Sequence, residues 1–142
     1  MKIISINNKN ISLLKHFIDK MGEVKKSFRY FDNRSIDVIK NHLATFMLLD
    51  EYDLALGYGH LDKENENVWL GICLLPEYKG MGYGNKMMEA LIESAKIQKI
   101  KSVLLTVDRG NFIAIKMYEK FYFRLIQEFE SYLKYELVIK YS

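Results

Sequence analysis

Residues 74–84 of the chain read Leu-Leu-Pro-Glu-Tyr-Lys-Gly-Met-Gly-Tyr-Gly, and this stretch decides how the rest is interpreted. The apolar segment Val68 to Leu75 predicts a strand, and a strong helical pattern follows the last glycine, with an apolar stripe of Met87, Met88, Leu91, Ile92 and Ala95. The three glycines alternate between strand and helix, where glycine permits positive φ and close approach of a ligand. Backbone N–H groups in such a turn, together with the positive end of the helix, form an anion site suited to phosphate.

The glycine spacing separates this turn from two common nucleotide motifs. A dinucleotide fingerprint needs GxGxxG, and a P-loop needs GxxxxGK[ST], whereas this turn reads GxGxG. A turn that merely lets the helix pack closely is the structural alternative. Lys79 adds a positive charge beside the glycines, and the combination favours phosphate binding.

The segments on either side of the turn predict one mixed α/β domain spanning residues 1–142, with a central sheet. The predicted strands are residues 2–6, 44–49, 54–61, 68–75 and 102–107, then two strands between 123 and 141 around Glu130-Ser131. Helices are predicted from Asn10 to near Gly22, through Ile36, Ile39 and Leu43 with Asn33 or Ser35 as cap, after Gly84, and from Asn111.

Composition and charge exclude several classes of protein. With 142 residues, 49% of them apolar and 27% charged, the chain is not a disordered, collagen-like or coiled-coil protein. The single cysteine and the absence of a Cys/His cluster predict neither disulfide nor metal. No apolar run has the ~18 residues of a membrane span, and the N-terminus does not resemble a signal peptide, so we expect a cytoplasmic protein without a membrane partner. The net charge of +3 with no dense basic stripe does not predict nucleic-acid binding. A homodimer is left open.

Two motifs together resemble a known family. Residues 74–84 look like the acetyl-CoA motif of the GNAT acetyltransferase superfamily, usually written [QR]xxGx[GA], with Lys79 where Arg or Gln is usual. Asn111-Phe112-Ile113-Ala114-Ile115-Lys116-Met117-Tyr118-Glu119-Lys120 resembles its second landmark, NxxAxxxYxK. The resemblance implies a GNAT-like mixed sheet of about seven strands with about four helices. It departs at Tyr122, where the family usually has Gly; a tyrosine in the left-handed region costs about 1 kcal/mol or more.

The resemblance also implies acetyl-CoA as cosubstrate and names the residues that would bind it. The backbone of Leu74 and Leu75 would pair with the pantetheine arm, and the Leu74 N–H would polarise the thioester carbonyl. The N–H groups of residues 81–85 would cradle the pyrophosphate. The expected cofactor-binding residues are Leu74, Leu75, Lys79, Gly80, Met81, Gly82, Tyr83, Gly84, Asn85, Asn111 and Ala114.

Acid–base roles follow from the same resemblance and from residue type. Tyr118 is expected to act as general acid toward the leaving CoA thiolate; without the motif it would be interpreted as an aromatic core residue. His60 is the candidate general base, with a structural strand histidine as the alternative. Asp62 and Glu77 are reserves acting through water, whereas His16 and His42 look structural or solvated. Cys73 has no neighbouring histidine in sequence, so we expect direct transfer rather than an acetyl-cysteine intermediate.

The acceptor is expected to be a primary amine on a small molecule. The segment containing Arg29, Tyr30 and Phe31 offers a guanidinium and aromatic faces, and it weakly resembles small acetyltransferases that act on nucleotide-linked amino sugars. A protein or peptide amine and a non-catalytic acyl-CoA-binding module are the alternatives.

Overall fold

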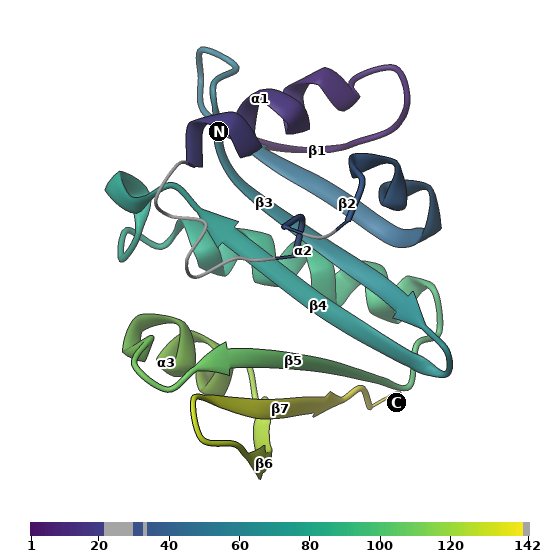
Figure 1. Ribbon diagram of the computed structural model, residues 1–142, viewed down its shortest axis with the longest axis vertical. Helices are drawn as coiled ribbons and strands as arrows, with labels where there is room; N and C mark the ends of the chain where they lie inside the picture. Colours follow the sequence, from purple (N-terminus) through teal and green to yellow (C-terminus); the bar gives the residue numbers. More distant parts are fainter. Residues whose placement is uncertain (22–29, 33, 141–142) are drawn as a thin grey trace.

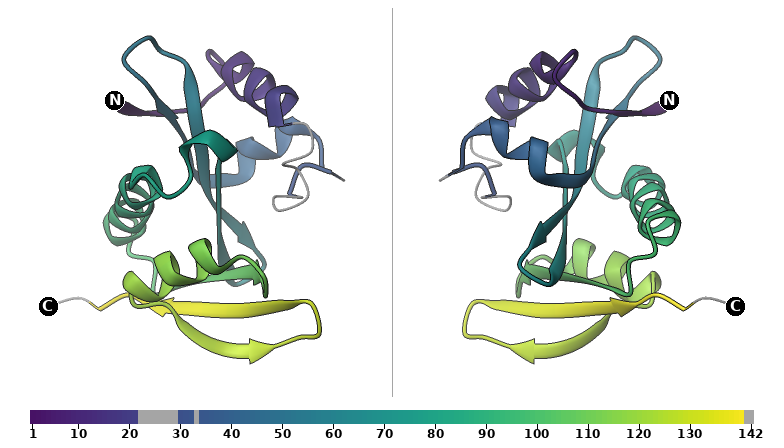
Figure 2. Two further views of the ribbon diagram at one scale, coloured as in Figure 1. Left: turned by 90° about the vertical axis from the view of Figure 1, so that its left-hand side faces the viewer. Right: turned by 90° about the vertical axis from the view of Figure 1, so that its right-hand side faces the viewer.

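The computed structural model describes residues 1–21, 30–32 and 34–140, and its frame is a seven-stranded sheet in the order β1-β2-β3-β4-β5-β7-β6 (Figures 1 and 2). The strands are β1 (Lys2–Ser5), β2 (His42–Leu49), β3 (Ala55–Glu64), β4 (Asn67–Leu74), β5 (Ser102–Asp108), β6 (Arg124–Glu128) and β7 (Tyr132–Val138). The helices of the described residues are α1 (Ile11–Met21), the 3-10 helices η2 (Ile36–Asn41) and η3 (Pro76–Tyr78), α2 (Tyr83–Ile97) and α3 (Phe112–Lys120). The predicted mixed α/β fold with about seven strands is confirmed.

Helices cover both faces of the sheet, because successive strand residues point to opposite faces. On one face, α1 places Leu14 and Phe17 against Met47 and Tyr58. On the other face, α2 and α3 pack against the sheet in a second core, in which Met87, Leu91 and Tyr118 meet Leu48, Leu61 and Leu105. The alternation therefore separates residues 58, 60 and 62 of β3 from residues 57, 59 and 61.

β4 and β5 diverge along most of their length. They are the sheet's parallel pair, and Trp69 with Leu104 is their sole register partner. The other neighbouring strands pair antiparallel over longer stretches. Figure 1 shows the two strands close where β5 begins and spread apart toward their C-terminal ends. The sheet consequently opens next to the glycine turn.

The prediction of a helix through Ile36, Ile39 and Leu43 is wrong in its extent. The segment forms the short η2, which Ser35 caps by accepting a hydrogen bond from the Asp37 N–H at 3.3 Å. Leu43 belongs to β2, because His42 already pairs with Asp62 of β3. β3 likewise runs on to Glu64, beyond its predicted end at Leu61, so that the predicted turn shrinks to residues 65–66. The remaining predicted elements agree with the structure within a few residues.

The end of α3 contains the strained residue that the sequence singled out. Tyr122 has φ of +72°, in the left-handed region, and its side chain is 82% exposed. The Tyr122 N–H donates to the Glu119 carbonyl, and the Phe123 N–H donates to the Tyr118 carbonyl at 3.1 Å. This is the Schellman arrangement that usually carries glycine. Tyr122 therefore adopts the strained conformation instead of ending the helix differently.

No helix formed by the described residues is long and apolar enough to cross a membrane.

Candidate functional site

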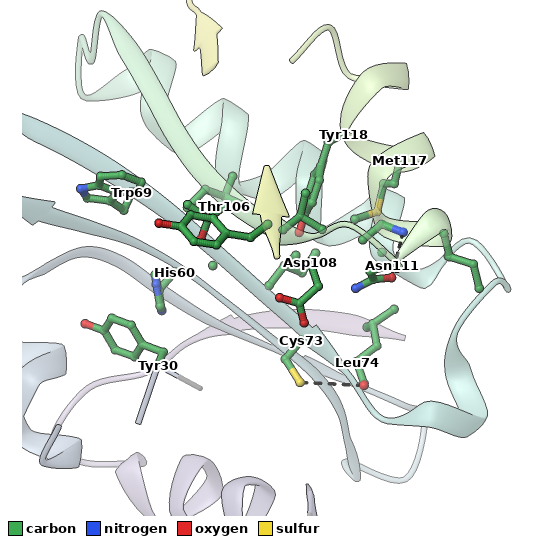
Figure 3. A pocket seen from close by; sticks show the side chains of 18 of the residues that line it. Tyr30, His60, Trp69, Cys73, Leu74, Thr106, Asp108, Asn111, Met117 and Tyr118 are labelled. Atoms are coloured by element: carbon green, nitrogen blue, oxygen red, sulfur yellow. Dashed lines mark hydrogen bonds between the residues drawn. The ribbon is translucent and has the colours of Figure 1, made fainter. Parts of the chain in front are cut away.

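A cavity of about 820 Å³ occupies the opening between β4 and β5. It is lined from both faces of the sheet, by the glycine turn, by α3 and by the pleated surface of β3. Figure 3 shows Tyr30 and His60 on one side of this cavity and Asn111, Met117 and Tyr118 on the other. Residues of both sequence motifs line this cavity.

The backbone of β4 presents a free donor to the cavity at Leu74. The Leu75 N–H donates to the Leu56 carbonyl of β3 at 3.0 Å. Because N–H directions alternate along a strand, the N–H of Leu74 points to the opposite side, toward β5. β5 does not pair with β4 there. This N–H can therefore donate to a ligand lying between the two strands.

The glycine turn supplies an anion-binding geometry at the start of α2. Gly80 and Gly82 have φ of +76° and +85°, and a Cβ added to either would meet no atom within 4 Å, so both border open space. Gly82 is the N-cap of α2, whose first N–H groups lack intrahelical partners. At Gly84 a Cβ would lie 2.7 Å from the Met117 Sδ, so α2 and α3 pack closely here and the Met117 side chain would have to move to admit one. The turn thus offers an anion open space, backbone N–H donors and the positive end of the α2 dipole.

α3 brings Tyr118 to the cavity from a fixed helix end. The Asn111 side chain caps the helix by accepting a hydrogen bond from the Ala114 N–H at 3.3 Å. Tyr118 is 6% exposed and lines the cavity, and its ring lies 5.9 Å from that of Phe123. Burial raises the pKa of the Tyr118 hydroxyl well above its usual value, so the group keeps its proton.

His60 lies on the opposite wall with a buried, neutral imidazole. It is 2% exposed, and its Nδ1 forms a 2.7 Å hydrogen bond with the Tyr58 hydroxyl. Burial, with a smaller contribution from neighbouring His42, lowers the pKa of His60 well below 6.5. Its ring lies flat over β4, since a Cβ added to Gly71 would be 2.5 Å from the His60 Nε2. Gly71 therefore makes room for His60.

Next to His60, a chain of hydrogen bonds ends on a buried carboxylate. The Tyr30 hydroxyl donates to the Asp62 Oδ2 at 2.7 Å and lies 2.7 Å from the His42 Nε2. The His42 Nδ1 is 2.9 Å from the Thr45 hydroxyl. Asp62 is 4% exposed and lines the cavity. Burial, followed by the bond to Asp62, raises the pKa of Tyr30.

Asp62 and Glu64 of β3 add carboxylates to the wall formed by Tyr30 and His60. Asp108, at the end of β5, also lines the cavity but lies toward Asn111 (Figure 3). Arg34 compensates Glu64 at 3.3 Å, and its guanidinium carbon lies 4.3 Å from the centre of the Tyr30 ring. No group of three or more His, Cys, Asp or Glu side chains among the described residues could hold a metal ion.

The cavity gathers most of the residues expected to bind the cofactor. Those that line it are Leu74, Lys79, Gly80, Gly82, Gly84, Asn85, Asn111 and Ala114. Leu75 packs into the core beneath α1, Met81 is 64% exposed, and Tyr83 packs against the core and Tyr78; none of the three side chains lines the cavity. The expected contribution of residues 81 and 83 through their backbone N–H groups does not depend on where these side chains lie.

Of the three residues expected to bind the acceptor, Tyr30 lines the cavity. Phe31 instead packs against Tyr30 and Tyr58, with ring centres 4.8 and 5.7 Å away. Arg29 lies outside the described residues.

Sequence reasoning missed His42 and undervalued Asp62. His42 was expected on a helix, as a structural or solvated residue, but it is the first residue of β2 and contacts both Tyr30 and His60. No local pattern marks it, because it hydrogen-bonds to Tyr30 and is paired with Asp62 of β3, both far away in sequence. Cys73 also lines the cavity, and burial raises the pKa of its thiol to about 12, so the thiol is not ionised at neutral pH.

Comparison with known proteins agrees with this geometry. Residues 11–123 match the model of the Acetyltransferase (GNAT) family. A spermine/spermidine N(1)-acetyltransferase of Bacillus subtilis is 35% identical over 89 residues, which are 61% of this chain and 54% of that protein. The chain thus spans about half the length of the curated relatives it first matches.

Solved structures show the same fold at low identity. A GNAT-family acetyltransferase from Staphylococcus aureus Mu50 superposes with a TM-score of 0.77 at 19% identity, covering 98% of this chain and 99% of that one. A spermidine N-acetyltransferase from Vibrio cholerae, solved with CoA and spermine, gives 0.75 at 15% identity, covering 96% and 94%. With the family match over most of its length, the chain belongs to the Acetyltransferase (GNAT) family.

Proposed function

We propose that this protein transfers the acetyl group of acetyl-CoA to a primary amine of a polyamine. The observation that carries the proposal is the single cavity that joins an anion-binding turn at one end to an acidic, aromatic wall at the other. Family membership supports the acetyl transfer, and the names of the similar spermine and spermidine acetyltransferases support the acceptor class.

The residues on the turn side fit acetyl-CoA. The open space at Gly80 and Gly82 admits a pyrophosphate against the first N–H groups of α2, and Lys79 adds a positive charge. The pantetheine arm would follow the unpaired edge of β4, with Asn111 and Ala114 on its far side. Acetyl-CoA supplies the activated acyl group as a thioester. The N–H of Leu74 is placed to donate to its carbonyl oxygen, where negative charge develops during attack.

The acid–base groups have protonation states that suit the transfer. Tyr118 holds its proton firmly and can donate it, or a hydrogen bond, to the departing sulfur. His60 is neutral and can accept the proton that the amine loses. The thiol of Cys73 stays protonated, which favours direct attack of the amine on the thioester over an acetyl-cysteine intermediate.

The acceptor wall favours a cation over a nucleotide-linked amino sugar. A nucleotide brings phosphate charges, which the buried carboxylate of Asp62 on this wall would repel. A polyamine brings ammonium groups, which the Asp62 carboxylate attracts. Its methylene chain can lie against the aromatic rings of Tyr30 and Trp69, which also line the cavity.

A screen for thiol release tests the proposal. The protein is mixed with acetyl-CoA and, separately, with spermidine, spermine, nucleotide-linked amino sugars, amino acids and peptides. The expected result is turnover highest with a polyamine and an acetylated product in the mass spectrum. Turnover highest with a sugar or peptide would overturn the acceptor class. Thermal stabilisation by acetyl-CoA without thiol release from any amine would instead identify a non-catalytic binding module.

A further inference from the structure

We propose that Asp62 binds the far ammonium group of the polyamine, and that Thr45, His42 and Tyr30 hold its carboxylate in the binding orientation. The inference rests on the proposed function and adds to it a residue that selects polyamines over short monoamines. It also assigns a role to His42 and Thr45, which the transfer chemistry does not use.

Burial without a counter-charge is the first argument. Asp62 is 4% exposed, yet its carboxylate forms no ion pair with any described residue, and the hydrogen bond that this carboxylate accepts comes from the neutral hydroxyl of Tyr30. A buried carboxylate is costly unless it is paired. The nearby guanidinium of Arg34 is engaged by Glu64. Because Asp62 lines the cavity, a cationic ligand can supply the missing charge.

The direction of the hydrogen bonds is the second argument. An ionised carboxylate only accepts, so the single hydroxyl proton of Tyr30 points to the Asp62 Oδ2. Tyr30 must then accept from the His42 Nε2–H, which leaves the Nδ1 of a neutral His42 to accept from the Thr45 hydroxyl. The whole chain donates toward Asp62. With Oδ2 held by Tyr30, Oδ1 remains for the ligand.

Position along the sheet is the third argument. Asp62 is paired with Trp69 of β4, five residues before Leu74, whose N–H would bind the thioester carbonyl in the proposed function. At the rise of a β-strand, five residues span about 16 Å. His60, paired with Gly71, lies between these two points on the same face as Asp62. A single amino group cannot lie at both Leu74 and Asp62. The long chain of a polyamine can place one amino group near Leu74 and another at Asp62.

The test compares spermidine with propylamine, a monoamine that has no second ammonium group. Asp62→Asn keeps an acceptor oxygen for Tyr30 and removes the charge. We expect kcat/KM for spermidine to fall about 10- to 100-fold, the loss of one charge-assisted contact, and kcat/KM for propylamine to change less than about twofold. If kcat/KM fell equally for both amines in a folded Asp62→Asn protein, Asp62 would not bind the far ammonium group, while the polyamine proposal would stand. A wild-type protein that acetylates no polyamine would overturn the proposed function and this inference together.

The positioning role of His42 has its own readouts. His42→Ala should raise the spermidine KM several-fold, and His42→Gln, whose amide can still donate to Tyr30, should restore most of the affinity. In an Asp62→Asn background His42→Ala should have no further effect, because contacts in one network are not additive. An equal His42→Ala effect in both backgrounds would show a purely structural role.

A spectroscopic readout is independent of turnover. The chain has three histidines, so imidazole nitrogen resonances can be assigned by substitution. We expect His42 to be the Nε2–H tautomer at neutral pH. The opposite tautomer would contradict the donation toward Asp62.

Discussion

Replacing Tyr122 with glycine should stabilise the protein, although it removes a large side chain. The φ of +72° places Tyr122 in a region that costs a non-glycine residue about 1–2 kcal/mol. Glycine avoids this strain but loses about 0.5–1 kcal/mol through its greater freedom in the unfolded chain. The side chain is 82% exposed, so little packing is lost. The net gain should be about 0.5–1 kcal/mol, or about 1–4 °C in Tm for a domain of this size.

Urea unfolding of the wild type, Tyr122→Gly and Tyr122→Ala measures this effect. Tyr122→Ala is the matched control, because it removes the ring but keeps a Cβ in the left-handed conformation. The reasoning requires Tyr122→Gly to be more stable than Tyr122→Ala at equal m-values. If Tyr122→Gly were no more stable than Tyr122→Ala, the strain at the end of α3 would be refuted. This helix end also belongs to the candidate site, because the Tyr118 carbonyl accepts the hydrogen bond from the Phe123 N–H that ends α3.

Three further predictions concern the cavity walls. Gly82→Val should lose the thermal stabilisation given by acetyl-CoA, because valine is strained at a φ of +85° and its side chain would enter the open space at the start of α2. Retained stabilisation in calorimetry of the folded variant would contradict pyrophosphate binding at this turn. Gly71→Ala should cost about 1–3 kcal/mol by crowding the His60 ring and should lower kcat; a fully active, equally stable variant would mean that His60 can move freely. The folded-state pKa of His60 is below its unfolded value, so its stabilising contribution is complete above pH ~6.5 and declines by about 1.4 kcal/mol per pH unit as the pH falls below that value. Unfolding curves of His60→Gln between pH 7 and 5 should lack this slope, and identical slopes would show that His60 is not buried in its neutral form.

The local features of the fold were predictable because they depend on neighbouring residues. The glycine turn before α2 and the Asn111 cap of α3 are encoded within a few positions, and both appear where the sequence indicated. Tyr122 was singled out because a tyrosine replaced the expected glycine, and it does adopt positive φ. Strands β4 and β5 were also predicted. Their divergence depends on how two strands distant in sequence meet, so no local pattern indicates it.

The partners that surround Tyr30 and His60 could not be predicted because they come from segments that meet only in the folded sheet. His42, Asp62 and Tyr30 are far apart in sequence, and the apolar spacing of Ile36, Ile39 and Leu43 favoured a helix over the start of β2. Pairing of His42 with Asp62 overrode that local preference. The sequence argument consequently emphasised the aromatic and basic residues 28–31 and an anionic acceptor, whereas the buried charge that the structure places beside Tyr30 is the carboxylate of Asp62.

The kinetics of Tyr118→Phe test most directly whether the cavity between β4 and β5 is an acetyltransferase site. Phenylalanine preserves the ring contact with Phe123 and removes only the hydroxyl that lines the cavity. At saturating acetyl-CoA and the best amine of the screen, we predict a kcat about 10²- to 10⁴-fold lower, with the dissociation constant of acetyl-CoA nearly unchanged. A kcat equal to that of the wild type, with chemistry shown to be rate-limiting, would contradict the account and leave Tyr118 as an aromatic residue of the core.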